Sequence, residues 1–393
     1  MKIKRVYIGG WFQRTTLHLS EIYDFLRTKT SGLKLDEKKL QFLHANLGLD
    51  STELKVEGLE TIHIRTKSDI AYKICEDGLI VLERDYEGDA DLAKEIKELT
   101  SYYEDRLSPA INYLFSLGAP VPKELANIKT IYPYFVVVDD ASREDIDGLL
   151  KRFKEHEYFE VRSPHFELYR GDKFYIINAK DESLKQVERF IEEQIFLREF
   201  KGQMHRYLNL HRIIWEKIDE VKERGSIKGK DIGEFNDKLQ GYAKTINLIG
   251  ARINQMGTYL STRERIVQED KQLKDFLGVL GYRYEAFSDT LDYLKEIWDM
   301  TKNYVDSGIA LFSDLQEQAT QHSVESLTVV TSMGVGATLI GLFTSDQPTF
   351  TAFGFYYFII LAAVGFGANR MLGWFYDRKK YEISSVDYDK NIK

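Results

Sequence analysis

Two long stretches without a charged residue lie near the end of this 393-residue chain and restrict what it can fold into. The first covers the 20 positions from Ser326 to Ser345, and the second covers the 23 positions from Gln347 to Asn369, with only Asp346 between them. As a helix, each is long enough to cross a hydrocarbon core about 30 Å thick. We therefore expect a hairpin of two transmembrane helices; the alternative is a pair of buried helices in a soluble domain.

Basic residues indicate the orientation of this hairpin. The connection between the two stretches contains no Lys or Arg, whereas the chain after them carries Arg370, Arg378, Lys379 and Lys380. Segments rich in Lys and Arg remain on the cytoplasmic side. Residues Val6–Phe12 are too few and too rich in glycine for the core of a signal peptide. We therefore expect a multi-pass protein of the cell (inner) membrane, with lipid around its spans and both termini in the cytoplasm.

The composition argues against several classes of protein. Hydrophobic residues make up 43% and charged residues 30% of the chain, as in folded proteins. The net charge of −8 argues against DNA as a partner. Cys75 is the single cysteine, so the sequence has no disulfide framework. It also has no histidine pair with the spacing of a helical metal site, no Gly-x-Ser-x-Gly elbow and no phosphate-binding loop, so we expect no enzyme and no covalent cofactor.

The positions of the prolines divide the part that precedes the membrane. None of the six prolines lies between His165 and Gln347, and this gap favours long helices. In the first 180 residues, short β-branched and aromatic runs alternate with segments of helical apolar spacing, which predicts an α+β domain. The predicted strands include residues 6–8, 61–64, 78–82, 134–138 and 174–177, and the predicted helices are 20–28, 36–47, 90–107 and 142–153.

A helical region follows this domain. One helical pattern runs from Leu184 to about Arg224, and after a basic turn rich in glycine a second pattern runs from Phe235 to about Glu269. From Tyr282 the pattern continues into the first charge-free stretch, which predicts a helix roughly 90 Å long. The predicted segments are a cytoplasmic α+β domain (1–180), a helical hairpin region (181–281), a stalk helix (282–325), the first transmembrane helix (326–345), an outer loop (346–348), the second transmembrane helix (349–370) and a basic cytoplasmic tail (371–393).

One face of the first predicted span combines hydroxyl and aliphatic side chains. Its residues recur at intervals of three or four and therefore share a helix face: Gln321, Val324, either Leu327 or Thr328, Thr331, Val335, Thr338 and Leu342. In a ring of such helices this face would line a pore, with polar bands separated by apolar constrictions that close by dewetting. Alternatively, small residues such as Gly334 and Gly336 serve close packing between helices.

The order of the segments resembles the CorA superfamily of two-span metal-ion channels. Four short stretches carry the resemblance in detail: 315–321, Leu327-Thr328-Val329-Val330, Gly341-Leu342-Phe343 and the aromatic-then-basic run from Phe375 to Tyr381. It extends over residues 180 to 383 in layout, and the first 180 residues show no match of this kind. The resemblance implies a homopentamer that passes Mg²⁺ or another divalent cation through a pore lined by the first span.

The sequence departs from this family at the outer mouth of the pore. Where the family carries its Gly-Met-Asn selectivity motif, this chain has Thr344, Ser345 and Asp346. The resemblance then implies a ring of five Asp346 carboxylates, which attracts cations by charge and puts selection for magnesium in doubt. Alternatively, Asp346 is a solvated turn residue.

Acidic residues of the cytoplasmic part are candidates for regulatory metal binding. In the CorA family, acidic positions between cytoplasmic domains bind divalent ions and hold the pore shut. Glu285, Asp289, Asp292 and Glu296 lie on the predicted stalk, where the alternative is a solvated helix face. The sequence names no specific metal ligands.

A segment near the start of the chain is a candidate ligand site. The predicted strand 6–8 is followed by two glycines and by Trp11, Gln13, Arg14, Thr15 and Thr16. Glycines allow a ligand to approach the backbone, Arg14 and the hydroxyls suit a phosphate, and Trp11 suits stacking on a base. The alternative is a hairpin turn with a tryptophan in the core.

Transport of cations through a CorA-like channel gated by the cytoplasmic domain is the function that these features favour. The alternative function is a membrane effector in antiviral defence, similar to the CorA-like proteins that accompany type III CRISPR systems and opened by a small adenylate-containing messenger. A third alternative is a membrane-anchored scaffold without a pore. A stability shift caused by nucleotides but not by magnesium would favour the effector.

Overall fold

A computed structural model of the chain describes most of the residues before Phe343 and fewer after it. The described residues are 1–13, 17–86, 91–115, 134–157, 159–163, 166–180, 183–222, 226–270, 273, 277–343, 356, 359–360, 363–364, 366–367, 370–371, 374 and 378–382. By its contacts the chain forms two compact units. Unit 1 comprises Met1–Leu208 with Leu248–Glu296, and unit 2 comprises Asn209–Asn247 with Ile297–Lys393.

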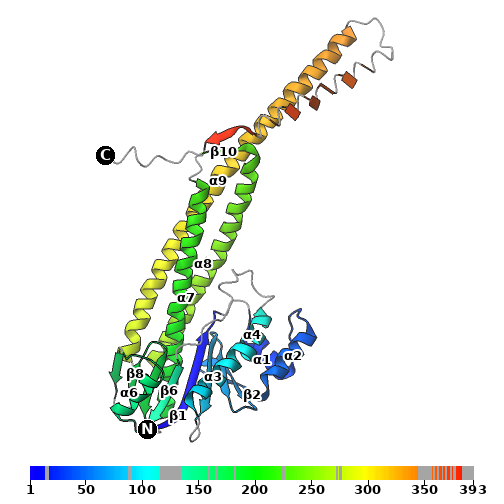
Figure 1. The fold of residues 1–393 in the computed structure, drawn as a ribbon. Helices are drawn as coiled ribbons and strands as arrows, with labels where there is room; N and C mark the ends of the chain where they lie inside the picture. The colour runs from blue at the N-terminus through cyan, green and yellow to red at the C-terminus, as the bar shows by residue number, and fades with distance from the viewer. Residues whose placement is uncertain are drawn as a thin grey trace, which may run out of the picture. The chain divides into compact units, whose positions relative to one another are not determined.

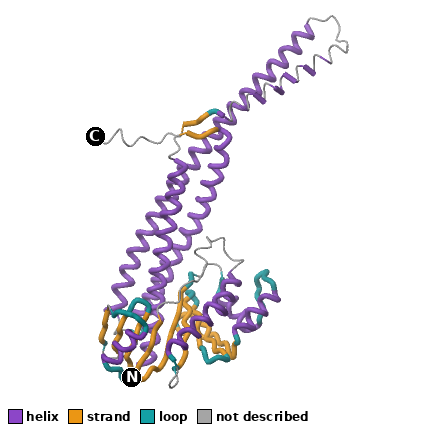
Figure 2. The backbone as a smooth tube through the Cα atoms, viewed as in Figure 1, coloured by secondary structure: helices purple, strands orange, loops and turns teal. Residues whose placement is uncertain are grey.

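Unit 1 is built on a mixed sheet of nine described strands (Figures 1 and 2). They are β1 (Lys2–Trp11), β2 (Leu49–Glu57), β3 (Leu59–Thr66), β4 (Ala71–Cys75), β5 (Leu79–Asp85), β6 (Tyr134–Asp139), β7 (Phe159–Arg162), β8 (Phe166–Arg170) and β9 (Phe174–Ala179). Their order in the sheet is β2-β3-β4-β5-β1-β6-β9-β8-β7. Neighbouring strands are antiparallel except β6 and β9, which are parallel. The first strand of the chain is therefore central in the sheet.

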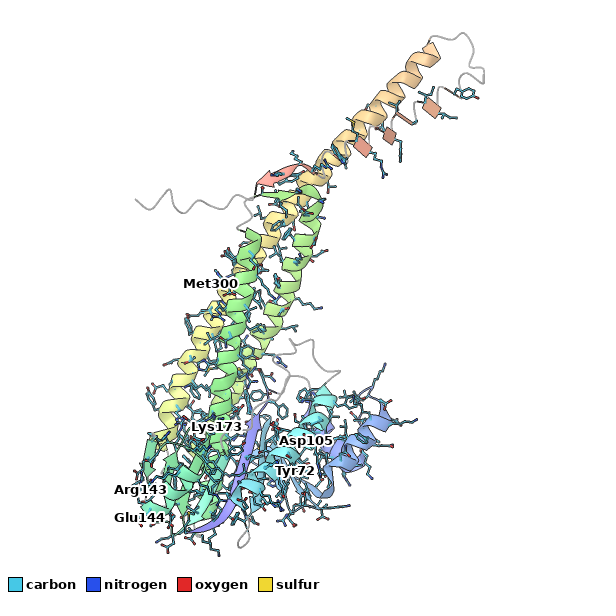
Figure 3. All side chains as sticks on the ribbon, viewed as in Figure 1. Tyr72, Asp105, Arg143, Glu144, Lys173 and Met300 are labelled. Carbon is cyan, nitrogen blue, oxygen red and sulfur yellow. The ribbon has the colours of Figure 1, made fainter. Side chains whose placement is uncertain are left out.

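Short helices contribute to a hydrophobic core with one face of this sheet. They are α1 (Leu19–Thr28), α2 (Glu37–Leu47), α3 (Leu92–Tyr102), the π-helical turn η1 (Tyr103–Leu107), α4 (Ser108–Phe115) and α6 (Arg143–Arg152). Val6 and Ile8 of β1 belong to this core, and so does Tyr72, which is labelled in Figure 3. The ring centroids of Tyr72 and Tyr102 are 5.9 Å apart. Asp36 caps α2 by accepting a 2.7 Å hydrogen bond from the backbone N–H of Lys39.

A long helix, α7 (Leu184–Lys222), begins against the opposite face. Successive strand residues point to opposite faces, so Gly9 of β1 lies on this side. A Cβ atom at Gly9 would lie 2.6 Å from the backbone oxygen of Ile80 and 2.9 Å from Cδ1 of Ile195 on α7. Glycine is therefore required for the close approach of α7 to the sheet.

Two further long helices complete the helical region: α8 (Ile232–Glu269) and α9 (Leu277–Phe343). The prediction of an α+β domain followed by long helices is confirmed. α9 has 67 residues and begins at Leu277 rather than at the predicted Tyr282. Gly281 lies inside the helix because a single glycine weakens a helix by only about 1 kcal/mol relative to alanine.

Unit 2 contains parts of the three long helices and a two-stranded sheet. Trp215 of α7 stacks on Tyr304 of α9 at 4.8 Å, and Phe235 of α8 stacks on Phe312 of α9 at 6.2 Å. A strand after α7, β10 (Ser226–Lys228), pairs antiparallel with β11 (Lys380–Glu382), and the 3₁₀ turn η3 (Gly229–Asp231) leads from β10 into α8.

Within the described residues, no helix carries an apolar stretch long enough to cross a membrane. The backbone of the first predicted span is described as far as Phe343, as the end of α9. Of the second predicted span only scattered residues are described, and the predicted outer loop lies outside the described residues.

Candidate ligand cleft and buried charge network

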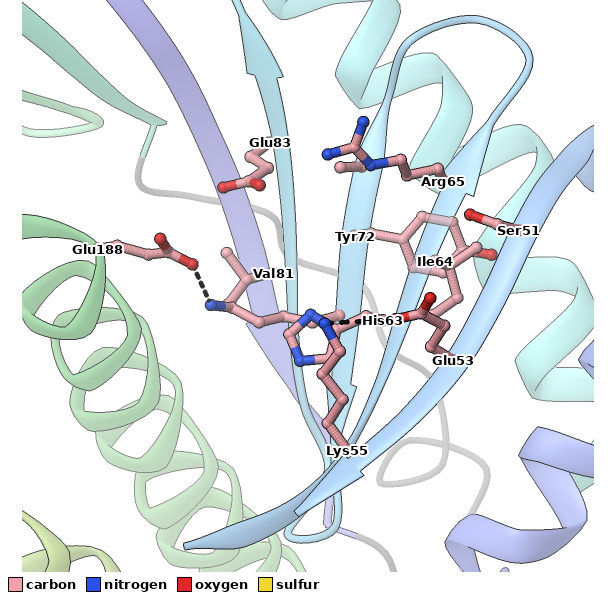
Figure 4. A pocket seen from close by; sticks show the side chains of 12 residues that line it. Ser51, Glu53, Lys55, His63, Ile64, Arg65, Tyr72, Val81, Glu83 and Glu188 are labelled. Carbon is pink, nitrogen blue, oxygen red and sulfur yellow. Dashed lines mark hydrogen bonds and ion pairs between the residues drawn. The ribbon is translucent and has the colours of Figure 1, made fainter. Parts of the chain in front are cut away.

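Strands β2 to β5 carry polar side chains on the face where α7 lies. The pairing of the strands arranges the residues of this face, most of them polar, in two rows across the sheet (Figure 4). One row consists of Glu53, His63, Lys73 and Val81, and the other of Ser51, Arg65, Ala71 and Glu83. These residues, with Lys55 and with Glu188 of α7, line a cleft of about 300 Å³.

Lys73 lies where this cleft meets α7. Its Nζ donates a 2.6 Å hydrogen bond to Oε1 of Glu188 and a second hydrogen bond to Oε1 of Glu192, both on α7. Burial disfavours the charge on Lys73, but the two carboxylates outweigh burial and raise its pKa. Burial opposes ionisation of Glu188 as well, yet Lys73 lowers the pKa of this carboxyl. The ion pair therefore stays charged at neutral pH.

Arg65 is the cationic group of the cleft that remains available. It is exposed, and among the described residues it has no ion-pair or hydrogen-bond partner for its side chain. It also lines a neighbouring cavity of about 460 Å³. By contrast, Lys55 pairs with Glu53 at 3.3 Å, and the guanidinium of Arg5 pairs with Glu83 at the same distance. A planar guanidinium without a partner suits a carboxylate or a phosphate.

A second charge cluster is buried on the same side of the sheet. Arg263 of α8 donates hydrogen bonds of 2.6 and 3.1 Å to the two carboxylate oxygens of Asp77, in the turn between β4 and β5. A third, of 2.7 Å, joins Arg263 to Glu193 of α7. Tyr284 of α9 donates a 2.5 Å hydrogen bond to the other oxygen of Glu193. Burial opposes the charge of Arg263, but Asp77 and Glu193 outweigh it and raise its pKa.

The two clusters are joined along α7. Glu192 contacts Lys73 of the cleft, and the next residue, Glu193, contacts α8 and α9. All of these residues belong to unit 1. Two hydrogen-bonded clusters, one in the cleft and one that reaches the beginning of α9, therefore meet at the consecutive residues Glu192 and Glu193 of α7.

The structure gives the residues near the start of the chain an internal role. Trp11 is buried against Phe196 and Phe200, with ring centroids 5.4 and 5.5 Å away, and its indole N–H donates a 2.8 Å hydrogen bond to the backbone oxygen of Asp77. This position corresponds to the alternative of a core tryptophan, since the ring has no free face for a base.

Of the other residues of the predicted ligand segment, one is buried and three lie outside the described residues. Gln13 is buried, donates a hydrogen bond to the backbone oxygen of Arg252 and accepts one of 2.7 Å from Tyr207. Neither Gln13 nor Trp11 lines the cleft. Arg14, Thr15 and Thr16 lie outside the described residues.

The predicted pore residues lie on the last part of α9. Gln321, Val324, Thr328, Thr331 and Val335 are exposed in the single chain. Thr328 donates its hydroxyl to the backbone oxygen of Val324 at 2.9 Å, so this hydroxyl is satisfied within the helix. The side chains of Leu327, Thr338 and Leu342, and the residues Thr344, Ser345 and Asp346 of the predicted outer mouth, lie outside the part that the structure describes.

No metal centre emerges from the described residues, which contain no group of three or more His, Cys, Asp or Glu side chains placed to hold an ion. All four predicted acidic residues on α9, Glu285, Asp289, Asp292 and Glu296, are exposed, and Asp292 pairs with Lys295 at 2.7 Å. Their arrangement matches the alternative of a solvated helix face.

Sequence analysis missed the cleft and the network behind it. Alternation of polar and apolar residues in β3 and β4 does place His63, Arg65 and Lys73 on one face. The partners of Lys73 lie more than a hundred residues away on α7, and local patterns do not encode such pairing.

Comparison with known proteins gives a structural likeness but no match in sequence. No protein-family model and no curated protein sequence matches the chain. Among solved structures the chain is similar to the soluble domain of CorA from Methanocaldococcus jannaschii, with 10% sequence identity and a TM-score of 0.24. The likeness covers 47% of this chain and 88% of that one. With a TM-score below 0.5, it does not establish a shared fold.

Proposed function

We propose that this chain is the subunit of a homo-oligomeric membrane channel that passes cations through a pore lined by α9 and is gated by its α+β domain. The observation that carries the proposal is the continuity of α9. One uninterrupted helix runs from Leu277 into the charge-free stretch that begins at Ser326 and ends, as described, at Phe343. A helix of this kind transmits a displacement at its beginning to the segment proposed to line the pore.

The chemistry of the proposed pore face supports cation passage. Thr328 and Thr331 are exposed on α9 together with Val324 and Val335, whose side chains are 57% and 60% exposed. Around the axis of an oligomer, threonines form polar bands and valines form apolar constrictions. A ring of Asp346 carboxylates at the outer mouth would raise the local cation concentration. The resemblance to the CorA superfamily favours five subunits and a divalent cation such as Mg²⁺.

The buried network supplies the proposed route of gating. A ligand in the cleft changes the environment of Lys73, and Glu192 and Glu193 connect Lys73 with Tyr284 on α9. The ligand opens the pore only to the extent that it binds the open state better than the closed state.

Cation flux through the reconstituted full chain tests this function. We expect influx of divalent cations into liposomes that contain the protein, and reduced influx for Asp346→Asn. A matched control is Asp306→Asn, which removes the same charge from an exposed position on α9. No flux of any cation under any ligand would leave a scaffold as the function. Unchanged flux in Asp346→Asn would reject only the carboxylate ring.

A nucleotide-gated effector is the second candidate. The observation that favours it is the cleft, in which Arg65 offers an unpaired guanidinium to a phosphate and the neighbouring Ser51 and Ala71 leave space. Thermal unfolding with adenine nucleotides and with Mg²⁺ discriminates the two candidates. We expect a nucleotide-induced shift to be lost in Arg65→Ala and kept in Arg162→Ala, which changes an exposed arginine on β7.

A further inference from the structure

A small sheet in unit 2 brings basic residues from two distant parts of the chain together. β10 lies between α7 and α8, and β11 follows the second charge-free stretch. The N–H of Gly229 donates a 3.1 Å hydrogen bond to the backbone oxygen of Lys379 and extends the pairing. The pair is visible in Figure 1 as the strand labelled β10 and the red arrow beside it.

The two faces of this sheet differ in chemistry. Ile227 and Tyr381 are directly opposite each other and are 4% and 6% exposed, so one face is buried. The next pair in register, Lys228 and Lys380, is exposed. Because side chains alternate along a strand, this pair belongs to the other face. The basic face is therefore open to solvent.

On the exposed face, Lys228 and Lys380 place two like charges directly opposite each other. Like charges directly opposite on antiparallel strands destabilise the pairing, because their Cβ atoms lie about 5 Å apart. Lys230, Arg378 and Lys379 are close in sequence and are also exposed. Among the described residues, none of these five cations has an ion-pair partner. A cluster of five positive charges favours the binding of an anionic partner.

The neighbouring tryptophan indicates where that partner lies. The guanidinium of Arg378 lies over the ring of Trp374, 4.0 Å from its centroid, and Trp374 is 55% exposed. An exposed tryptophan beside basic residues, just after an apolar stretch, is typical of the interface between a membrane and water. Anionic lipids of the cytoplasmic leaflet attract such clusters.

We propose that the basic face of the β10–β11 sheet binds the phosphate headgroups of anionic lipids at the inner surface of the membrane. The proposal rests on the membrane insertion contained in the proposed function. Bound headgroups neutralise Lys228 and Lys380 and thereby stabilise a sheet that ties the turn between α7 and α8 to the chain after the second charge-free stretch. The lipid composition then influences the position of both segments.

Quenching of tryptophan fluorescence by brominated lipids tests the proposal. The full chain is reconstituted in equal mixtures of phosphatidylglycerol and phosphatidylcholine, of which only one carries brominated chains. The signal of Trp374 is taken as the difference from Trp374→Phe. We expect brominated phosphatidylglycerol to quench Trp374 more strongly than brominated phosphatidylcholine. At low salt, we expect each lysine that is removed to lower this preference by about fivefold. The variants are Lys228→Gln, which removes one lysine, and Lys228→Gln/Lys380→Gln, which removes two.

Two controls separate charge from structure. Lys228→Arg/Lys380→Arg keeps the charges and is expected to keep the preference. Lys244→Gln/Lys302→Gln removes two exposed charges from α8 and α9 and is also expected to keep it. Equal quenching by the two lipids, or an unchanged preference in Lys228→Gln/Lys380→Gln, overturns the headgroup site and leaves membrane insertion standing. No quenching by either lipid overturns membrane insertion and the headgroup site together.

Discussion

Arg263 and Asp77 form a bidentate ion pair, and both side chains are only 3% exposed. The pair joins α8 to the turn between β4 and β5, and it shares its guanidinium with Glu193 of α7. Sequence separation between the two partners is large, so the pair holds together parts of unit 1 that no local interaction connects.

Replacing Arg263 with leucine is expected to destabilise the protein strongly. Arg263→Leu leaves the carboxylates of Asp77 and Glu193 buried without their cation, which costs about 3–5 kcal/mol. Urea unfolding of the full chain in detergent, followed by tryptophan fluorescence, measures the loss. Arg212→Leu is the matched control, because Arg212 is exposed and its ion pair with Glu216 is 3.9 Å long. Equal effects of the two variants would contradict the role of the buried pair.

A methyl group at Gly9 is expected to separate α7 from the sheet. In Gly9→Ala the new Cβ meets the backbone oxygen of Ile80, which cannot move without disturbing β5, and the side chain of Ile195. We expect a loss of about 1–3 kcal/mol in the free energy of unfolding. Gly148→Ala serves as the control, because Gly148 has open space around it in α6; there the substitution is expected to stabilise by about 0.5–1 kcal/mol. A neutral result for Gly9→Ala would refute the close approach.

Glu199 on α7 is expected to make the stability of the protein depend on pH. Burial raises the pKa of Glu199 to about 7, although Arg206 at 3.8 Å and Arg198 oppose this rise. Between pH 4.5 and about 7 the folded protein then binds more protons at this site than the unfolded chain, so stability falls as pH rises through this window. The difference amounts to about 3 kcal/mol at most.

Glu199→Gln removes this dependence. We expect the variant to be more stable than the wild type above pH 7 and similar to it near pH 5, when unfolding is measured across the pH range. Glu216→Gln changes a carboxyl that is 65% exposed, and its pH profile is expected to follow that of the wild type. Parallel profiles for Glu199→Gln and the wild type would disprove the raised pKa.

Tyr284 is expected to hold the beginning of α9 in place. Tyr284→Phe removes the 2.5 Å hydrogen bond to Glu193, and hydrogen bonds to charged groups contribute about 1.5–3 kcal/mol. We expect amide hydrogen exchange in the first turns of α9 to accelerate by about tenfold or more. Tyr293→Phe is the control, since the side chain of Tyr293 is 57% exposed on the same helix. Identical exchange in the two variants would exclude Glu193 as the link between α7 and α9.

A polar substitution at Val335 is expected to open the proposed pore. Asparagine at this position hydrates an apolar constriction, so Val335→Asn should raise cation flux into liposomes in the absence of ligand. Met333→Asn places the same side chain two positions earlier, about 200° around the helix, and is expected to leave the basal flux unchanged. Increased flux in both variants would assign the effect to general perturbation of the helix.

Local patterns were sufficient to predict part of the regular elements of the fold, but they missed the strands β2, β4, β7 and β8. The strands β3, β5, β6 and β9 and the helices α1, α2 and α6 contain their apolar periodicity within a few residues, and α9 has no proline. The short strands β10 and β11 were not predicted, because their pairing depends on residues about 150 positions apart. For the same reason the cleft could not be predicted, because Glu188 of α7 lies beside Lys73 of β4 only in the folded chain.

The ambiguous cases were decided by packing. Trp11 suited either a ligand or a core, and only the positions of Phe196 and Phe200 on α7 show that its ring is enclosed. Gly278 and Gly281 indicated a break before α9, yet the helix includes both, because helical hydrogen bonding on either side tolerates glycine.

The central place of β1 in the sheet has a consequence for biosynthesis. β1 leaves the ribosome before β5 and β6, its two neighbours in the sheet, and β6 ends only at Asp139. β1 therefore keeps one unpaired edge until at least that point of translation. A nascent chain that stalls before Asp139 leaves the backbone N–H and C=O groups of that edge without their partners in β6, and such an edge is a template for pairing with another chain.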